Sequence, residues 1–256
     1  MTKDVQQQLK EQLKQEKIEV EVDGSKRGFA VFERFPDFVP YIAKGYGDSK
    51  KILLIWESYY ASYKESIEAV KSPAKWYFDT PQEDIDKLKE FRKGKKEEHL
   101  REWNFASKMY ADGIDRKSRT FANVANVFKE FIPKGEDPFR YCAGYNFYLR
   151  PAKEMESIKD KPIDREIAAK TLRKVIDILN PEYVVFLSKK SYGVFKKECK
   201  GFKQEFPSVV FAAFAHPSPL HNWWNRKHGK DKLSAKERFT QFLRDNVFNN
   251  KQQIKQ

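Results

Sequence analysis

The order of hydrophobic and polar positions predicts that strands and helices alternate along most of the chain. Three short apolar runs, ILLI at 52–55, YVVFL at 183–187 and SVVFAAFA at 208–215, have no regular polar alternation, which is typical of strands buried on both faces of a parallel sheet. The stretch YCAGYNFYL at 141–149 fits a further strand, the second of the four in chain order. We therefore expect an α/β fold in which helices cover both faces of a central sheet.

Apolar residues spaced by three and four predict the helices of this fold. They indicate helices over 3–17 and 164–179, much of 81–132, and 234–248, where Ser234 and Glu237 form a capping-box pattern. The segment 189–200 fits a further short helix. The fold class expected is a three-layer α/β/α arrangement around a mostly parallel, four-stranded sheet.

The first 45 residues have a different pattern. The segments 18–22 and 28–35 alternate with period two around Asp23-Gly24, which predicts a β-hairpin. We interpret 1–45 as an N-terminal helix and hairpin elaboration, and 46–250 as a single α/β domain.

Composition narrows the class of protein. The formal net charge of +13 favours a polyanionic partner, because Lys and Arg that neutralise phosphates release bound counterions. Two cysteines exclude a cluster or zinc site held by four thiolates of one chain, and the four His have no ligand spacing, so we expect no metal and no cofactor. The polar N-terminus and the lack of a long apolar run predict a soluble, cytoplasmic protein without membrane contact, and we expect a monomer.

Polar side chains lie within or directly after three of the predicted strands. Glu57 comes after the first strand, Asn146 lies in the second, and His216 follows the fourth. Ligands of open α/β sheets bind at the carboxyl ends of the strands, so we expect these three side chains at one rim. A carboxylate, an amide and an imidazole together suit a planar heterocycle and its bond to a sugar. Read singly, each has an ordinary structural explanation as a helix-terminal acid, a turn residue and part of a rigid turn.

Four segments carry a resemblance to the uracil-DNA glycosylase superfamily, over roughly residues 50 to 245. HPSPL at 216–220 is identical to the start of that family's leucine-loop motif and follows an apolar strand. ILLIWESYY resembles the first motif, a strand followed by GQDPY or GEAPG, and AGYNFYL resembles the second, in which an Asn reads the base. YVVFLSKKSYGVF is similar to the penultimate strand and helix, with Ser188 where a Gly is common.

The resemblance implies roles for residues of this chain. His216 would stabilise the departing base anion, Glu57 would orient water or oppose positive charge on the sugar, and Ser58 stands where GQDPY has its catalytic Asp. Asn146 and Tyr60 would bind the base. The partner implied is DNA, single-stranded or containing uracil, from which the nucleotide is flipped out. Its predicted contacts lie in and after HPSPL: Ser218, Leu220, Trp223, Trp224, Arg226 and Lys227.

Three functions stay open on the sequence. The first is hydrolysis of an N-glycosidic bond, with Glu57 carrying the acid function. The second is a non-catalytic DNA- or nucleotide-binding module of the same fold, because Ser58 replaces the Asp. A third, a hydrolase with Ser58 as nucleophile, is disfavoured because Trp56 and Tyr60 stand where a nucleophile elbow has glycines.

Overall fold

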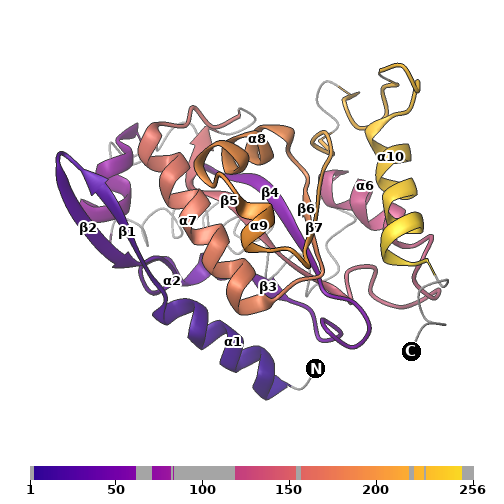
Figure 1. Cartoon of the computed structure of the whole chain (residues 1–256), viewed down its shortest axis with the longest axis horizontal. Coiled ribbons are helices and arrows are strands. Elements are labelled where there is room, and N and C mark those ends of the chain that lie inside the picture. Colours follow the sequence, from indigo (N-terminus) through magenta and orange to yellow (C-terminus); the bar gives the residue numbers. More distant parts are fainter. Residues whose placement is uncertain are drawn as a thin grey trace.

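A five-stranded, mostly parallel sheet forms the centre of the protein, and helices flank it (Figure 1). The computed structural model describes residues 3–61, 71–81, 83, 119–153, 157–218, 222–227 and 229–249. In spatial order the strands are β3 (Tyr41–Ile42), β5 (Cys142–Lys153), β4 (Ile52–Ala61), β6 (Tyr183–Phe186) and β7 (Val210–Ala213).

The expected count of four strands is wrong by one. The last four of these strands are mutually parallel, as the apolar runs predict, and β3 adds an antiparallel edge strand through the pairs Tyr41↔Gly144 and Ile42↔Ala143. A strand of two residues is too short to show any periodicity, so the pattern of hydrophobic positions could not reveal it.

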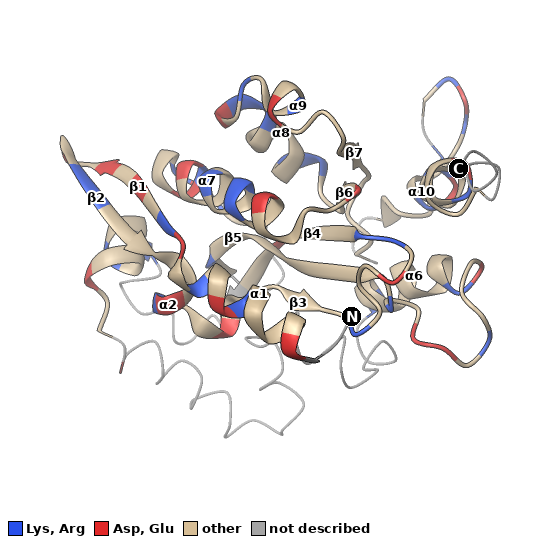
Figure 2. Ribbon diagram, turned by 60° about the horizontal axis from the view of Figure 1, so that its bottom comes forward, with Lys and Arg blue, Asp and Glu red and all other residues tan. Residues whose placement is uncertain are grey.

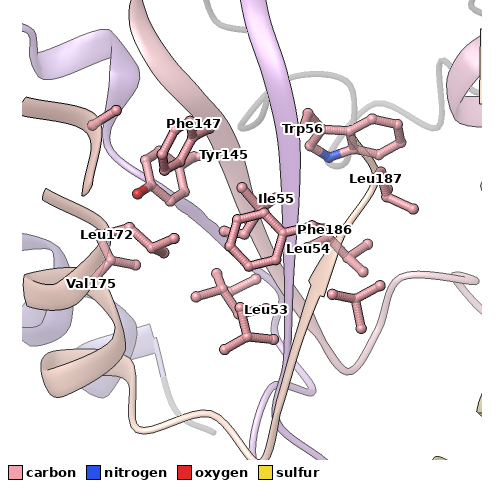
Figure 3. Packing of buried hydrophobic residues seen from close by; sticks show 14 of the residues in the cluster. Leu53, Leu54, Ile55, Trp56, Tyr145, Phe147, Leu172, Val175, Phe186 and Leu187 are labelled. Atoms are coloured by element: carbon pink, nitrogen blue, oxygen red, sulfur yellow. The ribbon is translucent and has the colours of Figure 1, made fainter. Parts of the chain in front are cut away.

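Helices pack on the sheet through apolar side chains. In Figure 2, α7 (Pro162–Leu179), α8 (Lys189–Glu198) and α9 (Phe202–Glu205) lie together on one side of the sheet. Figure 3 shows Leu172 and Val175 of α7 on one side of β4 and the indole of Trp56 on the other. That indole stacks on Phe121 of α6 (Arg119–Phe128), with ring centroids 4.1 Å apart.

The C-terminal helix begins as its sequence predicts. In α10 (Ala235–Phe242) the backbone N–H of Glu237 donates to Ser234 Oγ at 3.2 Å, and the Glu237 carboxylate accepts from Ser234 N at 2.6 Å. A π-helical turn, η7 (Leu243–Val247), continues the helix. Phe239 packs against Phe128 of α6 and Phe214, which joins α6 and α10 to the end of β7.

The N-terminal elaboration contacts α7. It consists of α1 (Lys3–Gln15), β1 (Lys17–Val22), β2 (Ser25–Ala30), α2 (Val31–Arg34) and η1 (Pro36–Phe38). Asp23 and Gly24 both have positive φ, 51° and 76°, so the predicted hairpin turn is confirmed. The second strand ends earlier than expected, because Val31 and Phe32 are buried in a helical turn instead of continuing the strand.

One predicted helical region is only partly described. Residues 84–118 of the stretch 81–132 lie outside the described residues. The π-helical turn η3 (Lys75–Asp79) precedes them, and α6 follows. None of the helices in the described ranges combines the length and the apolar character that a bilayer span requires.

Candidate active site at the carboxyl ends of the parallel strands

The strand order places a topological switch point between β4 and β6. Counted along the chain, the four parallel strands have the spatial order second, first, third, fourth, so the connections from β4 and β6 leave the sheet in opposite directions. Ligands of such sheets bind in the crevice beyond the carboxyl ends of the two strands at this point. The pairing of β4 with β6 ends at Ile55↔Phe186, whereas β4 continues beside β5 to Ala61. Glu57 therefore lies just past the end of β6.

Serine hydroxyls hold both carboxylate oxygens of Glu57. Ser188, the first residue after Leu187, donates from Oγ to Glu57 Oε2 at 3.0 Å, and Ser157 donates from Oγ to Oε1. Ser188 is also the N-cap of α8, since its Oγ accepts from the backbone N–H of Ser191 at 3.3 Å. The carboxylate is thus tied to the first turn of α8, where the helix dipole favours negative charge.

His216 follows β7 at the same end of the sheet. The backbone N–H of Ser218 donates to its Nδ1 at 3.2 Å, so in the neutral ring the proton is on Nε2. Burial lowers the pKa of His216 below its usual 6.5, and the negative charge of nearby Glu57 opposes that shift. Burial therefore favours the neutral imidazole, with Nε2 as a hydrogen-bond donor. Asn123 of α6 fixes the following turn by donating from Nδ2 to the Pro217 carbonyl at 2.7 Å.

Asn146 is buried on β5, directly opposite Trp56 in the parallel register. The hydroxyl of Tyr59 lies beside its backbone and side chain. Burial raises the pKa of Tyr59, and the backbone and side chain of Asn146 reduce this rise. The Tyr59 hydroxyl makes no hydrogen bond of good geometry with the described residues. The register pairs Asn146 with Trp56, the residue before Glu57, so Asn146 and Glu57 lie on adjacent strands but face opposite sides of the sheet.

Ser58 and Tyr60 are placed less favourably for chemistry. The Oγ of Ser58 is buried and has no hydrogen-bond partner in the described part of the chain, so no base activates it as a nucleophile there. A serine hydrolase is therefore not supported. The backbone of Tyr60 pairs with Ala152, and its side chain lies outside the described residues.

The segment after HPSPL divides into a buried and an exposed part. Trp224 is only 1% exposed and packs on Phe239 of α10, so its predicted stacking on a base is corrected to a role in the core. Trp223 is 47% exposed, and the Arg226 guanidinium lies 6.0 Å from its ring centroid. Lys227 is exposed with Nζ 3.9 Å from Glu237. Leu220 lies outside the described residues.

Residues that the sequence interpretation left out complete the surroundings of Glu57. Ser188 directly follows a predicted strand, so the rule that selected Glu57 and His216 could have selected it as well. Ser157 and Lys190, which lies 3.3 Å from the Ser157 hydroxyl, carry no such signal. Within the described ranges, His, Cys, Asp and Glu side chains form no group of three that could hold a metal ion.

Neither a protein-family model nor a curated protein sequence matches this chain.

Proposed function

We propose that the protein is a uracil-DNA glycosylase-like, three-layer α/β/α protein that hydrolyses the N-glycosidic bond of a flipped uracil or another deaminated base in DNA. The arrangement that supports this most is that Glu57, just past the end of β6, and His216, which follows β7, both lie at the carboxyl ends of neighbouring parallel strands, where the charge of Glu57 acts on the pKa of His216. A carboxylate beside a neutral imidazole suits a reaction in which the sugar becomes positive while the base leaves with negative charge.

The proposed mechanism assigns one task to each side chain. The Nε2–H of His216 donates to a carbonyl oxygen of the base and stabilises the anion that forms as the bond to the sugar C1′ breaks. Glu57 faces the opposite charge on the sugar and orients the water that adds to C1′. Base and sugar separate, water adds its hydroxyl to C1′ and releases a proton to solvent, and the base anion takes up a proton from solvent.

The binding surface proposed for DNA is the exposed part of the segment after HPSPL. Trp223 offers a π face to an unpaired base, and Arg226 and Lys227 offer cations to phosphates. The net charge of the chain, +13, favours association with a polyanion over the whole surface.

Release of free base from DNA oligonucleotides containing uracil, hypoxanthine or xanthine tests the proposal. We expect release by the unchanged protein, a loss of about 100-fold or more in Glu57→Gln, and a similar loss in His216→Ala. Glu130→Gln is the matched control, because this exposed acid lies on the turn after α6, and it should retain the rate. Equal rates for Glu57→Gln and the control would contradict the role of Glu57.

The second candidate is a binding module of the same fold without chemistry. It is favoured by the hydrogen bonds that both oxygens of Glu57 already accept from serines, together with the Ser at position 58. Intact DNA binding without base release from any of the three substrates would select this candidate over the enzyme.

A further inference from the structure

The hydrogen bonds of Glu57 have a defined direction. A carboxylate has only acceptors, so the hydroxyl hydrogens of both Ser157 and Ser188 point at Glu57. Each hydroxyl has a single hydrogen, which is therefore committed to this contact. The lone pairs of the two hydroxyls remain free to accept, and both of them do.

The Ser188 hydroxyl is fixed by the helix that it caps. Its oxygen accepts the backbone N–H of Ser191 at 3.3 Å, and Ser188 is almost completely buried, with 2% of its surface exposed. Since α8 packs against β6 through Phe195 and Phe186, the position of this oxygen is set by the rigid part of the fold. The hydrogen bond to Glu57 extends that order to the carboxylate.

The Ser157 hydroxyl is fixed by Lys190, the second residue of α8. An ammonium group can only donate, so the contact of 3.3 Å between Lys190 Nζ and Ser157 Oγ directs the serine hydrogen away from Lys190 and toward Glu57. Lys190 is itself held by the Ile158 carbonyl, by Asp160 at 3.1 Å and by the ring of Tyr148, whose centroid lies 5.6 Å from Nζ.

We propose that Ser157 and Ser188 are positioning residues that fix the direction of the Glu57 carboxylate, and that Lys190 orders Ser157 for this task. The catalytic part of this inference rests on the proposed function, but the geometric part does not. Without the two hydroxyls, a partly buried carboxylate would turn toward water to recover its hydrogen bonds, and its charge would then lie in water, where it is screened from His216.

Five variants test the clamp that Ser157, Ser188 and Lys190 form on Glu57. Ser157→Ala and Ser188→Ala each remove one hydroxyl, Lys190→Met removes the cation, and Ser188→Thr and Lys190→Arg keep the hydroxyl and the charge. Ser234→Ala controls for a lost helix cap, and Lys197→Met controls for a lost cation on α8, because neither contacts Glu57. All are compared for base release and for titration of His216 by NMR.

We expect Ser157→Ala, Ser188→Ala and Lys190→Met to lower kcat about tenfold with little change in KM. In Ser157→Ala and Ser188→Ala the pKa of His216 falls, because the charge of Glu57 that raises it becomes screened by water. Lys190→Met also removes a positive charge, which by itself raises the pKa of a histidine, so this variant is assessed by kcat. Ser188→Thr and Lys190→Arg restore most of both properties, and the two control variants leave both unchanged.

The two readouts separate the clamp from the proposed function. A lowered pKa of His216 in a protein that releases no base supports the clamp and overturns the glycosylase. Base release by the unchanged protein, with kcat and the His216 titration both unaffected by the loss of either hydroxyl, overturns the clamp and leaves the glycosylase standing. An equal loss of kcat in Ser234→Ala and Ser188→Ala assigns the effect to stability and also overturns the clamp.

Discussion

His216 and Glu57 interact through charge, and this can be measured without any substrate. Burial lowers the pKa of His216 from its usual 6.5, and the charge of Glu57 raises it. In Glu57→Gln the raising contribution is lost, so the pKa of His216 falls further below 6.5. NMR signals of the His216 imidazole ring, recorded between pH 4 and 8, measure this shift. Glu130→Gln is the control variant and should leave the titration unchanged. An unchanged titration in Glu57→Gln would place the two side chains farther apart than the structure does.

Asp164 and Arg150 form an ion pair in the protein interior. Asp164 is fully buried and takes two hydrogen bonds from the Arg150 guanidinium, at 2.8 and 2.7 Å, and one from the Tyr77 hydroxyl at 3.1 Å. Removing one partner of such a pair leaves an uncompensated buried charge, which typically costs about 3–5 kcal/mol.

We therefore expect Asp164→Ala to lower the free energy of unfolding in urea by about 3–5 kcal/mol. Glu11→Ala is the control, since Glu11 pairs with Lys14 on the exposed surface of α1, where the loss should stay below about 1 kcal/mol. Equal losses in the two variants would contradict the assignment of Asp164 to the stabilising core.

The start of α10 gives a prediction at the scale of a secondary-structure element. Ser234 accepts one orphan N–H of the helix, and Ala cannot replace this contact, so Ser234→Ala should lower the free energy of unfolding by about 1 kcal/mol. Ser234→Asp keeps an acceptor at the N-cap and should retain most of the stability. Thermal unfolding followed by circular dichroism compares the three proteins, and equal midpoints for all three would exclude a stabilising cap.

The parallel strands and most described helices could be predicted because their signals are local. ILLI at 52–55 and YVVFL at 183–187 are buried on both faces. The capping box is formed by Ser234 and Glu237, which are only three residues apart. The fifth strand could not be predicted, because Tyr41–Ile42 becomes a strand only through its pairing with β5, about 100 residues away.

The same rule accounts for part of the candidate site. The positions of Glu57 and His216 follow from the rule that strand ends meet, whereas Asn146 lies within β5 and Ser157 reaches Glu57 only through the tertiary fold. The adjacent Trp223 and Trp224 show the limit of sequence, since they have the same side chain but differ in exposure by 47% against 1%. Packing against Phe239 decides which of the two indoles is buried.

At the scale of the whole molecule, the net charge of +13 predicts DNA binding that weakens with salt. The logarithm of the association constant should fall linearly with the logarithm of salt concentration, because each neutralised phosphate releases counterions. Arg226→Gln and Lys227→Gln should each reduce the slope by about 1 if each cation contacts one phosphate.

Lys26→Gln is the control for these two substitutions. Lys26 is exposed on β2, and Figure 1 shows the hairpin at the opposite end of the molecule from α10. Its slope should equal that of the unchanged protein. A binding constant that does not depend on salt would contradict contact with phosphates at any site.

The Ser188 hydroxyl couples the stability of α8 to the position of the Glu57 carboxylate. One atom both begins α8 and anchors the acid. Replacing Ser188 with Asp, which is a good helix cap, would preserve the helix while removing the only hydrogen that this side chain gives to Glu57. A substitution chosen only to strengthen this helix cap would therefore weaken the placement of the carboxylate, whereas Thr keeps the hydroxyl group that serves both purposes.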